Sequence, residues 1–215
     1  MNKYIREPIN SISHLLGVIS SFFGLLAMII KVVAVDDFSP SKLTSAIIFG
    51  LSLIFLYTAS SIYHSVKSSD KVITVLRKLD HSMIFVLIAG TYTPICAVVL
   101  KGNLRIGVLI TVWTLAIVGI LVKVFWNNCP RWLYTSFYIA MGWMALTLSV
   151  PIYRNLLLSG FLWLLVGGIL YTIGGIIYAI KSPNISPKFG FHEIFHIFVL
   201  MGSFSHFWLV YKFIL

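Results

Sequence analysis

Charged residues are scarce in this sequence. Only 10% of its 215 residues are Asp, Glu, Lys or Arg, whereas charged residues make up about a quarter of an ordinary soluble domain. Apolar residues account for 59% of the chain, and the mean hydropathy is +0.98. This composition excludes a soluble globular domain and predicts an integral membrane protein.

Acidic residues are the rarest charged class, with six Asp and Glu against sixteen Lys and Arg and a formal net charge of +10. Basic residues beside a bilayer attract anionic lipid, so membrane lipids are the expected partners. The sequence has neither a hydrophilic basic domain nor a repeat of basic and aromatic residues, so we expect no nucleic-acid partner. The sequence does not indicate an oligomeric state.

Cysteine is nearly absent as well. The chain has two cysteines, Cys96 near the end of an apolar stretch and Cys129 in a polar connection. They fall on opposite faces of the membrane and cannot form a disulfide. Neither has a second cysteine at the spacing of a thiolate zinc site, so we expect two free thiols.

Long polar segments are also missing. Seven apolar stretches, each about as long as the 20 residues that cross a bilayer, cover residues 13–35, 43–66, 79–100, 106–126, 132–153, 159–180 and 191–213. Barrel strands would be about ten residues of alternating polarity, a pattern that these stretches do not follow. The sequence predicts an all-α, polytopic membrane protein whose residues 1–215 form a single bundle of seven transmembrane helices. Residues 1–12 carry no signal-peptide cleavage pattern, so we expect them to be retained.

The distribution of basic residues predicts the orientation. Ten Lys and Arg residues fall on the side of the N-terminus and of the second, fourth and sixth connections, and six fall on the other side with Asp36 and Asp37. Basic residues are retained on the cytoplasmic side. We therefore predict a multi-pass protein of the cell membrane with a cytoplasmic N-terminus and an external C-terminus.

Metal-binding and polar side chains gather at one membrane face. His192 and His196 are four residues apart and share one face of the last helix, as do two imidazoles that bind one zinc ion. The second stretch ends with Ser60 and His64, and the third begins with Asp80. The parity of the crossings brings all of these residues to the same face, whichever way the protein is inserted.

Three neutral imidazoles with an open fourth position are typical of a catalytic zinc site. We therefore predict that His64, His192 and His196 bind zinc. Asp80 would either take a proton from the metal-bound water or fix the orientation of that water. The alternative interpretation is that the two histidines of the HxxxH pair are hydrated among lipid headgroups and bind no metal.

The motifs together resemble those of the hemolysin III family, which is similar to the progestin and adipoQ receptors and, more distantly, to alkaline ceramidases. The resemblance rests on Glu7-Pro8-x-Asn10 with His14, Ser60-x-x-x-His64, Leu79-Asp80-His81 running into Gly90-Thr91-Tyr92-Thr93-Pro94, and His192-Glu193-x-x-His196 running into Gly202-Ser203-x-x-His206. It implies a seven-helix fold and zinc on three histidines at the cytoplasmic side. It also implies that the matching serine and aspartate lie beside a metal-bound water, and that the chemistry is hydrolysis of a lipid amide such as ceramide. We expect no additional N-terminal soluble segment like that of the adiponectin receptors, which argues against a hormone-receptor role.

Other polar residues have different expected roles. We expect His14 to bond a backbone carbonyl or Asn10, and His81 to face another helix or headgroups. His206 lies about 15 Å farther along the last helix than the HxxxH pair, so we expect it to pack in the outer half. Glu193 completes the HExxH signature of zinc peptidases. Other helices supply the third ligand and the aspartate, so we expect Glu193 to support the site or face a loop rather than to act as the base of an intramembrane protease.

Three functions therefore stay open. The first is a zinc-dependent hydrolase acting on a lipid amide or ester, in which Asp80 activates the water and Ser60 helps to hold the substrate or the developing oxyanion. The second is a non-enzymatic membrane lipid sensor or homeostasis protein with structural zinc. The third is a cytolysin, as the family name suggests. The outer halves of the stretches carry few ionisable groups besides His206, which argues against a pore formed by one chain but leaves an oligomeric pore open.

Overall fold

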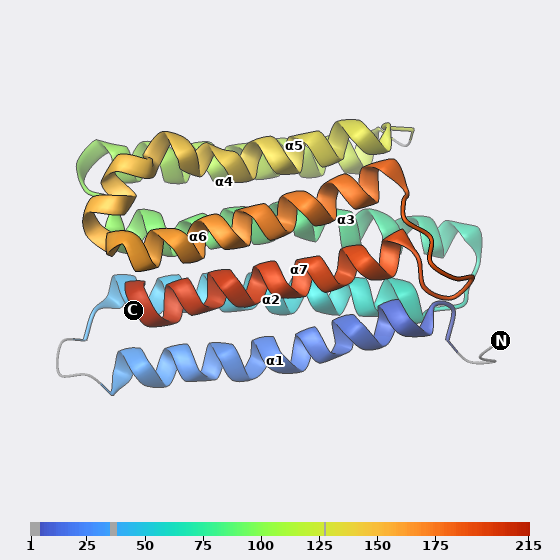
Figure 1. Ribbon diagram of the computed structural model, residues 1–215, viewed down its shortest axis with the longest axis horizontal. Helices are drawn as coiled ribbons and strands as arrows, with labels where there is room; N and C mark the ends of the chain where they lie inside the picture. The colour runs from blue at the N-terminus through green and yellow to red at the C-terminus, as the bar shows by residue number, and fades with distance from the viewer. Residues whose placement is uncertain (1–4, 35–37, 127) are drawn as a thin grey trace.

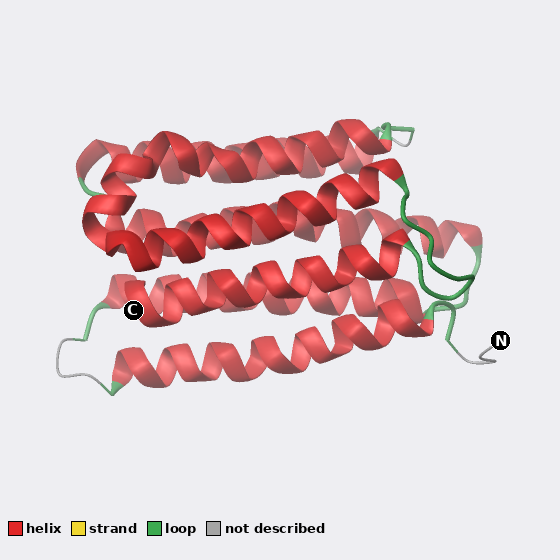
Figure 2. Cartoon of the chain, in the orientation of Figure 1, coloured by secondary structure: helices red, strands yellow, loops and turns green. Residues whose placement is uncertain are grey.

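The chain folds into long helices that run along a common axis (Figure 1). The computed structural model describes residues 5–34, 38–126 and 128–215. Its elements are α1 (Pro8–Val33), α2 (Pro40–Ser65), α3 (Asp70–Pro94), the π turn η1 (Ile95–Val99), α4 (Gly102–Phe125), α5 (Arg131–Trp143), the 3-10 turn η2 (Met144–Leu148), α6 (Ser149–Ile180), α7 (Phe191–Leu209) and the π turn η3 (Val210–Ile214). No strand forms within these described ranges (Figure 2). The predicted all-helical class is confirmed.

The number of apolar segments differs from the prediction. Six helical segments of the described chain are long and apolar enough to cross a membrane. The longest, Arg131–Ile180, has 50 residues and covers both the fifth and the sixth predicted stretches. It is interrupted at Leu157, whose φ of 56° and ψ of −178° are not helical, and Figure 1 shows α5 and α6 side by side. The sequence predicts seven separate helices, whereas the fifth and sixth predicted stretches fall within this one interrupted segment of the described chain.

Proline and glycine mark several helix ends. Pro8 and Pro40 lie at the first turns of α1 and α2, where the missing N–H would have no helical partner. Pro94 is the last residue of α3, and the chain continues into a π turn rather than an α-turn. Gly190 precedes α7, and the carboxylate of Glu193 accepts a hydrogen bond from its backbone N–H. This hydrogen bond from the N-cap backbone to the Glu193 side chain helps to fix where the last helix starts.

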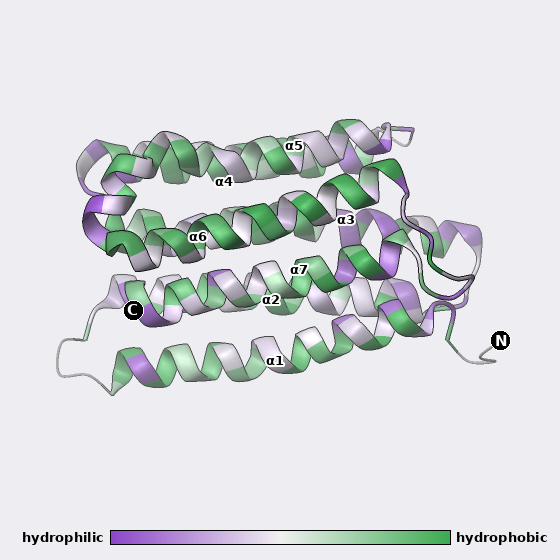
Figure 3. Ribbon diagram, viewed as in Figure 1, coloured by the Kyte–Doolittle hydropathy of each residue, from purple (hydrophilic) through white to green (hydrophobic). Residues whose placement is uncertain are grey.

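The helices divide into inner and outer ones. In their most apolar windows, 61% of the residues of α2 and 67% of those of α3 are buried, compared with 22% for α1 and 17% for α4. Large apolar side chains on the outer helices face away from the bundle, as Phe23 and Ile110 do. Hydrophobic residues cover the length of the helices, and hydrophilic ones concentrate toward their ends (Figure 3). A surface of this kind suits contact with lipid tails, which are as apolar as leucine.

The two ends of the bundle hold different parts of the chain. The start of α1 and the end of η3 lie at opposite ends, and the end of α2 and the starts of α3 and α7 lie at the same end as the start of α1 (Figure 1). Cys96 and Cys129 are free, as predicted. The predicted limit of the first stretch at residue 35 and the acidic pair Asp36 and Asp37 fall outside the described residues.

Candidate metal centre

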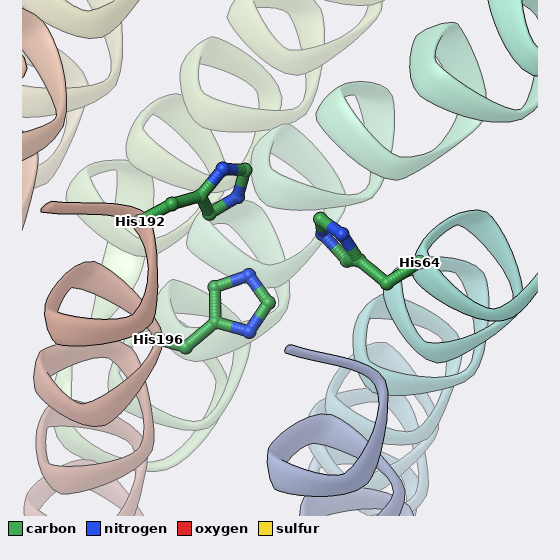
Figure 4. A group of neighbouring side chains, drawn as sticks. All are labelled: His64, His192 and His196. Atoms are coloured by element: carbon green, nitrogen blue, oxygen red, sulfur yellow. The ribbon is translucent and has the colours of Figure 1, made fainter. Parts of the chain in front are cut away.

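Three imidazoles from two helices meet at one end of the bundle. His64 lies in the last turn of α2, and His192 and His196 lie in the first turns of α7. One ring nitrogen from each falls within 4.8 Å of the others. Figure 4 shows the two imidazoles of α7 pointing toward the imidazole of His64. The predicted shared face of His192 and His196 is confirmed, and so is the convergence of His64 on them.

The donor set fits a zinc ion. Nitrogens bound to one tetrahedral zinc at 2.0–2.1 Å lie about 3.3 Å apart, so small side-chain rotations would bring these three into range. His64 is fully buried and His196 is 1% exposed. Within the described chain, Nε2 of His64 has no hydrogen-bond partner. A buried ring nitrogen without a partner costs free energy, and a metal ion would satisfy it.

Residues before and at the start of α1 orient two of the three imidazoles. Oε2 of Glu7 accepts a hydrogen bond from Nδ1 of His64 over 2.6 Å, which leaves Nε2 of that ring as the free lone pair. The Ser13 hydroxyl donates to the carbonyl of Asn10 over 3.0 Å, so at 3.2 Å from Nδ1 of His196 it is placed to accept. Both rings therefore present Nε2 to the cluster. Such outer partners fix the tautomer and orientation of metal-binding histidines.

Glu7 remains ionised in this position. Burial raises the pKa of its carboxyl, but the hydrogen bond from His64 and the charge of Arg6 outweigh that effect and hold the pKa below its usual value. Nε of Arg6 lies 3.2 Å from Oε1 of Glu7. The carboxylate is therefore held between a guanidinium on one side and an imidazole on the other.

Glu193 supports the site from outside the cluster, in the role expected of it. One of its oxygens accepts from the backbone N–H of Gly190 over 2.8 Å. The other accepts from the side-chain amide of Asn10 over 2.7 Å. The same amide lies 3.3 Å from Glu7, so Asn10 links the carboxylates of α7 and of the segment before α1. With both oxygens engaged, Glu193 is not placed as the base of a peptidase.

Ser60 and Asp80 come together beside the cluster. Both side chains are buried, at 1% and 7% exposure, and the Ser60 hydroxyl hydrogen-bonds to the Asp80 carboxylate. Asp80 lies close enough to His64 for their charges to interact, but it is not among the residues that share the 4.8 Å cluster. A carboxylate that lies beside the histidine cluster, without being one of its members, is in a position to exchange a proton with a molecule bound there.

The remaining histidines are all buried, and one prediction about them was wrong. His14 was expected to bond a carbonyl or Asn10, but neither of its ring nitrogens has a partner within the described residues. It stacks instead on His196, with ring centroids 3.6 Å apart and planes 9° apart. The expectation that His81 faces another helix is confirmed, since its Nε2 lies 3.2 Å from the Tyr178 hydroxyl of α6. His206 also contacts α6, with its Nε2 3.2 Å from the Leu164 carbonyl.

A mainly apolar cavity opens next to the cluster. Its volume is about 160 Å³, and its polar end is lined by Ser60, Asp80, His192 and His196. From there it continues along the bundle between apolar side chains, among them Leu87, Ile88, Leu164, Leu165, Phe161 and Val199. The arrangement combines ligands for a metal, a carboxylate and a hydroxyl with room for an apolar chain. It can hold an amphiphilic molecule whose polar group reaches the histidines.

Similar proteins match nearly the whole chain. A family model described as Haemolysin-III related matches residues 2–207. A Hemolysin-3 homolog of Bacillus subtilis (strain 168) is 41% identical over 208 residues, covering 96% of this chain and 93% of that protein. Hemolysin-3 of Bacillus cereus is 38% identical over 216 residues, covering 100% of this chain and 95% of that protein. The matched range includes all three histidines of the cluster.

Proposed function

The chain belongs to the haemolysin-III-related family, and we propose that it is a membrane zinc hydrolase that cleaves an amide or ester bond in a lipid. The observation that carries the proposal is that His192 and His196 of the cluster line the polar end of an apolar cavity, beside the buried pair Ser60 and Asp80. A metal site alone does not require a cavity, and a lipid-binding cavity does not require histidines. The two together suit chemistry on the polar group of a lipid.

The three histidines would hold the zinc. The orientation of His64 by Glu7 and of His196 by Ser13 supports this assignment, because each contact leaves Nε2 free toward the cluster. A set of three protein ligands keeps one position open, as catalytic sites do. When bound there, zinc would supply Lewis-acid activation of water and of a carbonyl group.

Asp80 would move the proton of the reaction. It would accept a proton from the attacking water and return it to the amine or alcohol that leaves, so that a fatty acid and an amine or alcohol result. General acid–base catalysis of this kind contributes roughly 10²- to 10⁴-fold to a rate. Because the Ser60 hydroxyl already bonds Asp80, we assign Ser60 first to orienting this carboxylate. Donation to a developing oxyanion would require the Ser60 hydroxyl to rotate away from Asp80.

The cavity defines the class of substrate. Its polar end can take a carbonyl group and its apolar length can take an acyl chain. Burying an apolar chain there removes it from headgroup water at about 0.8 kcal/mol per CH₂. We therefore propose a lipid amide or ester with a single acyl chain reaching into the bundle.

We further propose that the chain crosses the membrane seven times. The start of α1 and the end of η3 lie at opposite ends of the bundle (Figure 1), which supports an odd number of crossings. The break at Leu157 within Arg131–Ile180 supplies the additional reversal. The end with the histidines also holds Arg6, Lys78 and Arg131, so the positive-inside rule places the zinc site and the N-terminus on the cytoplasmic side and the C-terminus outside.

A non-enzymatic lipid sensor with structural zinc is the second candidate. The observation in its favour is the tight burial of His64 and His196, at 0% and 1% exposure, because structural zinc sites are closed. Cytolysis, which the names of the two Bacillus relatives indicate for those proteins, is a third candidate. Release of haemoglobin from erythrocytes mixed with vesicles that contain the protein would detect it.

The experiment that separates hydrolase from sensor is a lipid panel. Detergent-purified parent and Asp80→Asn protein are incubated with ceramides, acyl-amino acids and phospholipids, and free fatty acid is measured by mass spectrometry. We expect the parent to release fatty acid from one class of lipid and Asp80→Asn to lose at least 100-fold of that rate with zinc still bound. The matched control is Asp70→Asn, an exposed acid at the start of the same helix, which should keep full activity. No release from any lipid by a zinc-loaded parent would favour the sensor.

A further inference from the structure

A second cavity lies between α3, α4 and α5. Its volume is about 200 Å³. Aromatic and aliphatic side chains line most of it, including Phe85, Val122, Trp126 and Phe137. We call this cavity the α4 groove. Among the described residues that line it, Lys123 is the only Lys or Arg.

Positive charge concentrates at the mouth of the α4 groove. The ammonium of Lys123 is half-buried and lies 3.8 Å from the centroid of the Tyr134 ring. Arg77 and Arg131 are close enough for their charges to repel it, and Asp80 is the one carboxylate whose charge reaches it from the protein interior. In the described part of the chain, no carboxylate lies within ion-pairing distance of Lys123, Arg77 or Arg131. A half-buried ammonium in apolar surroundings is costly unless an anion accompanies it.

The combination identifies the class of ligand. Lys123 lies in the last turn of α4, where the apolar segment meets the headgroup region. An occupant must therefore offer an apolar chain to the groove and a negative charge to the cations at its mouth. We propose that the α4 groove binds an anionic phospholipid, with an acyl chain against Val122 and Phe137 and the phosphate at Lys123. A zwitterionic phospholipid has no net negative charge for these cations to attract, so the site favours anionic headgroups.

The α4 groove is independent of the proposed hydrolase, because none of the three histidines of the metal centre lines it. The two cavities nevertheless share one wall. Tyr134 borders both the α4 groove and the central cavity. A phospholipid bound in the groove would therefore pack against the outer side of a residue that also lines the central cavity.

Trp126 offers a reporter inside the groove. The parent and a Trp126→Phe variant are reconstituted in phosphatidylcholine vesicles, and the difference between their fluorescence isolates the signal of Trp126 from the other five tryptophans of the chain. Phosphatidylglycerol brominated on its acyl chains is then compared with phosphatidylcholine brominated in the same way. Because bromine quenches indole on contact, the quenching measures how often each lipid occupies the groove.

We expect brominated phosphatidylglycerol to reach half-maximal quenching of Trp126 at about a fivefold lower mole fraction than brominated phosphatidylcholine. That factor corresponds to about 1 kcal/mol for one basic residue near a membrane surface. Lys123→Gln should make the two lipids equal. Arg77→Gln removes a second positive charge near the mouth of the groove. Because the Arg77 side chain is exposed, the substitution leaves the packing unchanged, and it should reduce the preference for phosphatidylglycerol in part.

The matched control is Lys101→Gln, which removes a cation at the opposite end of α4 and should leave the preference unchanged. Equal quenching by the two lipids in the parent would overturn the proposal. So would a preference that persists in both Lys123→Gln and Arg77→Gln, because the selectivity would then have another source.

Discussion

Replacing Glu7 by glutamine should weaken zinc binding more strongly than any other change outside the three histidines. Oε2 of Glu7 accepts the Nδ1 proton of His64 over 2.6 Å, and this contact keeps the Nε2 lone pair of His64 directed at the cluster. Glutamine retains the length of the side chain and a carbonyl oxygen but loses the negative charge. The imidazole then becomes less basic, and its preferred tautomer is no longer imposed by an ionic acceptor.

The size of the effect follows from the kind of hydrogen bond that is lost. A bond to a charged group contributes about 1.5–3 kcal/mol, which corresponds to a change of about 10- to 100-fold in affinity. The side chain of Glu7 is 39% exposed, so solvent screening places the expected change near 10-fold. Ser13→Ala removes a neutral contact of 3.2 Å to His196 and should cost less, about 2- to 10-fold.

Competition with a zinc chelator, followed by a zinc-sensitive dye, measures these affinities in detergent. Asp70→Asn removes an acid at the start of α3 that is exposed, and it should leave the affinity as in the parent. Thermal unfolding of the metal-free proteins checks that each variant folds. Unchanged affinity in Glu7→Gln, or an equal loss in Asp70→Asn, would refute the assignment of Glu7 as the residue that orients His64.

Two further predictions concern metal removal and topology. Because ligands from α2 and α7 would share one ion, chelation should lower the midpoint of thermal unfolding, and added zinc should restore it. Zinc at 100 times its dissociation constant should raise the free energy of unfolding by about 2.7 kcal/mol. An unchanged midpoint would mean that no metal links the helices. With Cys96 and Cys129 replaced, Asn128→Cys should react with an impermeant thiol reagent from the cytoplasmic side, and Asp37→Cys, at a position outside the described residues, from the external side. The opposite labelling pattern would invert the orientation but leave the histidine cluster intact.

The sequence was sufficient to predict what depends on periodicity and parity. The spacing of His192 and His196 fixed their common face, because a helix of 3.6 residues per turn places residues four apart together. The parity of the crossings brought His64 to the same end, and the structure places it there. The same reasoning placed Ser60 and Asp80 nearby, and both line the cavity next to the cluster.

The partners of these residues were harder to predict, because they depend on how α1 packs against α2 and α7. In the sequence, Glu7 and Asn10 stand out only as parts of a family motif, and no pattern indicates a role for Ser13. A signal was present, since Asn10 and Ser13 are three residues apart in α1 and so are neighbours on its surface, and Glu7 directly precedes that helix. Which imidazole each one contacts could not be derived from that spacing, because the contacts span 57 residues for Glu7 and 183 for Ser13.

Two other features were outside the reach of local rules. His14 was predicted to find a hydrogen-bond acceptor, because buried polar groups usually do, whereas it packs its ring against His196. The break at Leu157 occurs at a residue with no turn propensity, and its positive φ is a conformation that glycine or asparagine would signal in advance. Helical structure lies on both sides of that residue, so the fifth and sixth predicted stretches fall within one interrupted segment.

Zinc content is the most direct test of the central claim that His64, His192 and His196 form a metal centre. The parent protein and a His64→Ala variant, purified without added metal, are analysed by mass spectrometry of the elements and normalised to protein concentration. We expect about one zinc per chain in the parent and less than a tenth of that in His64→Ala. Full occupancy in the variant, or a parent that neither carries zinc nor takes it up, would contradict the assignment of these three histidines as zinc ligands.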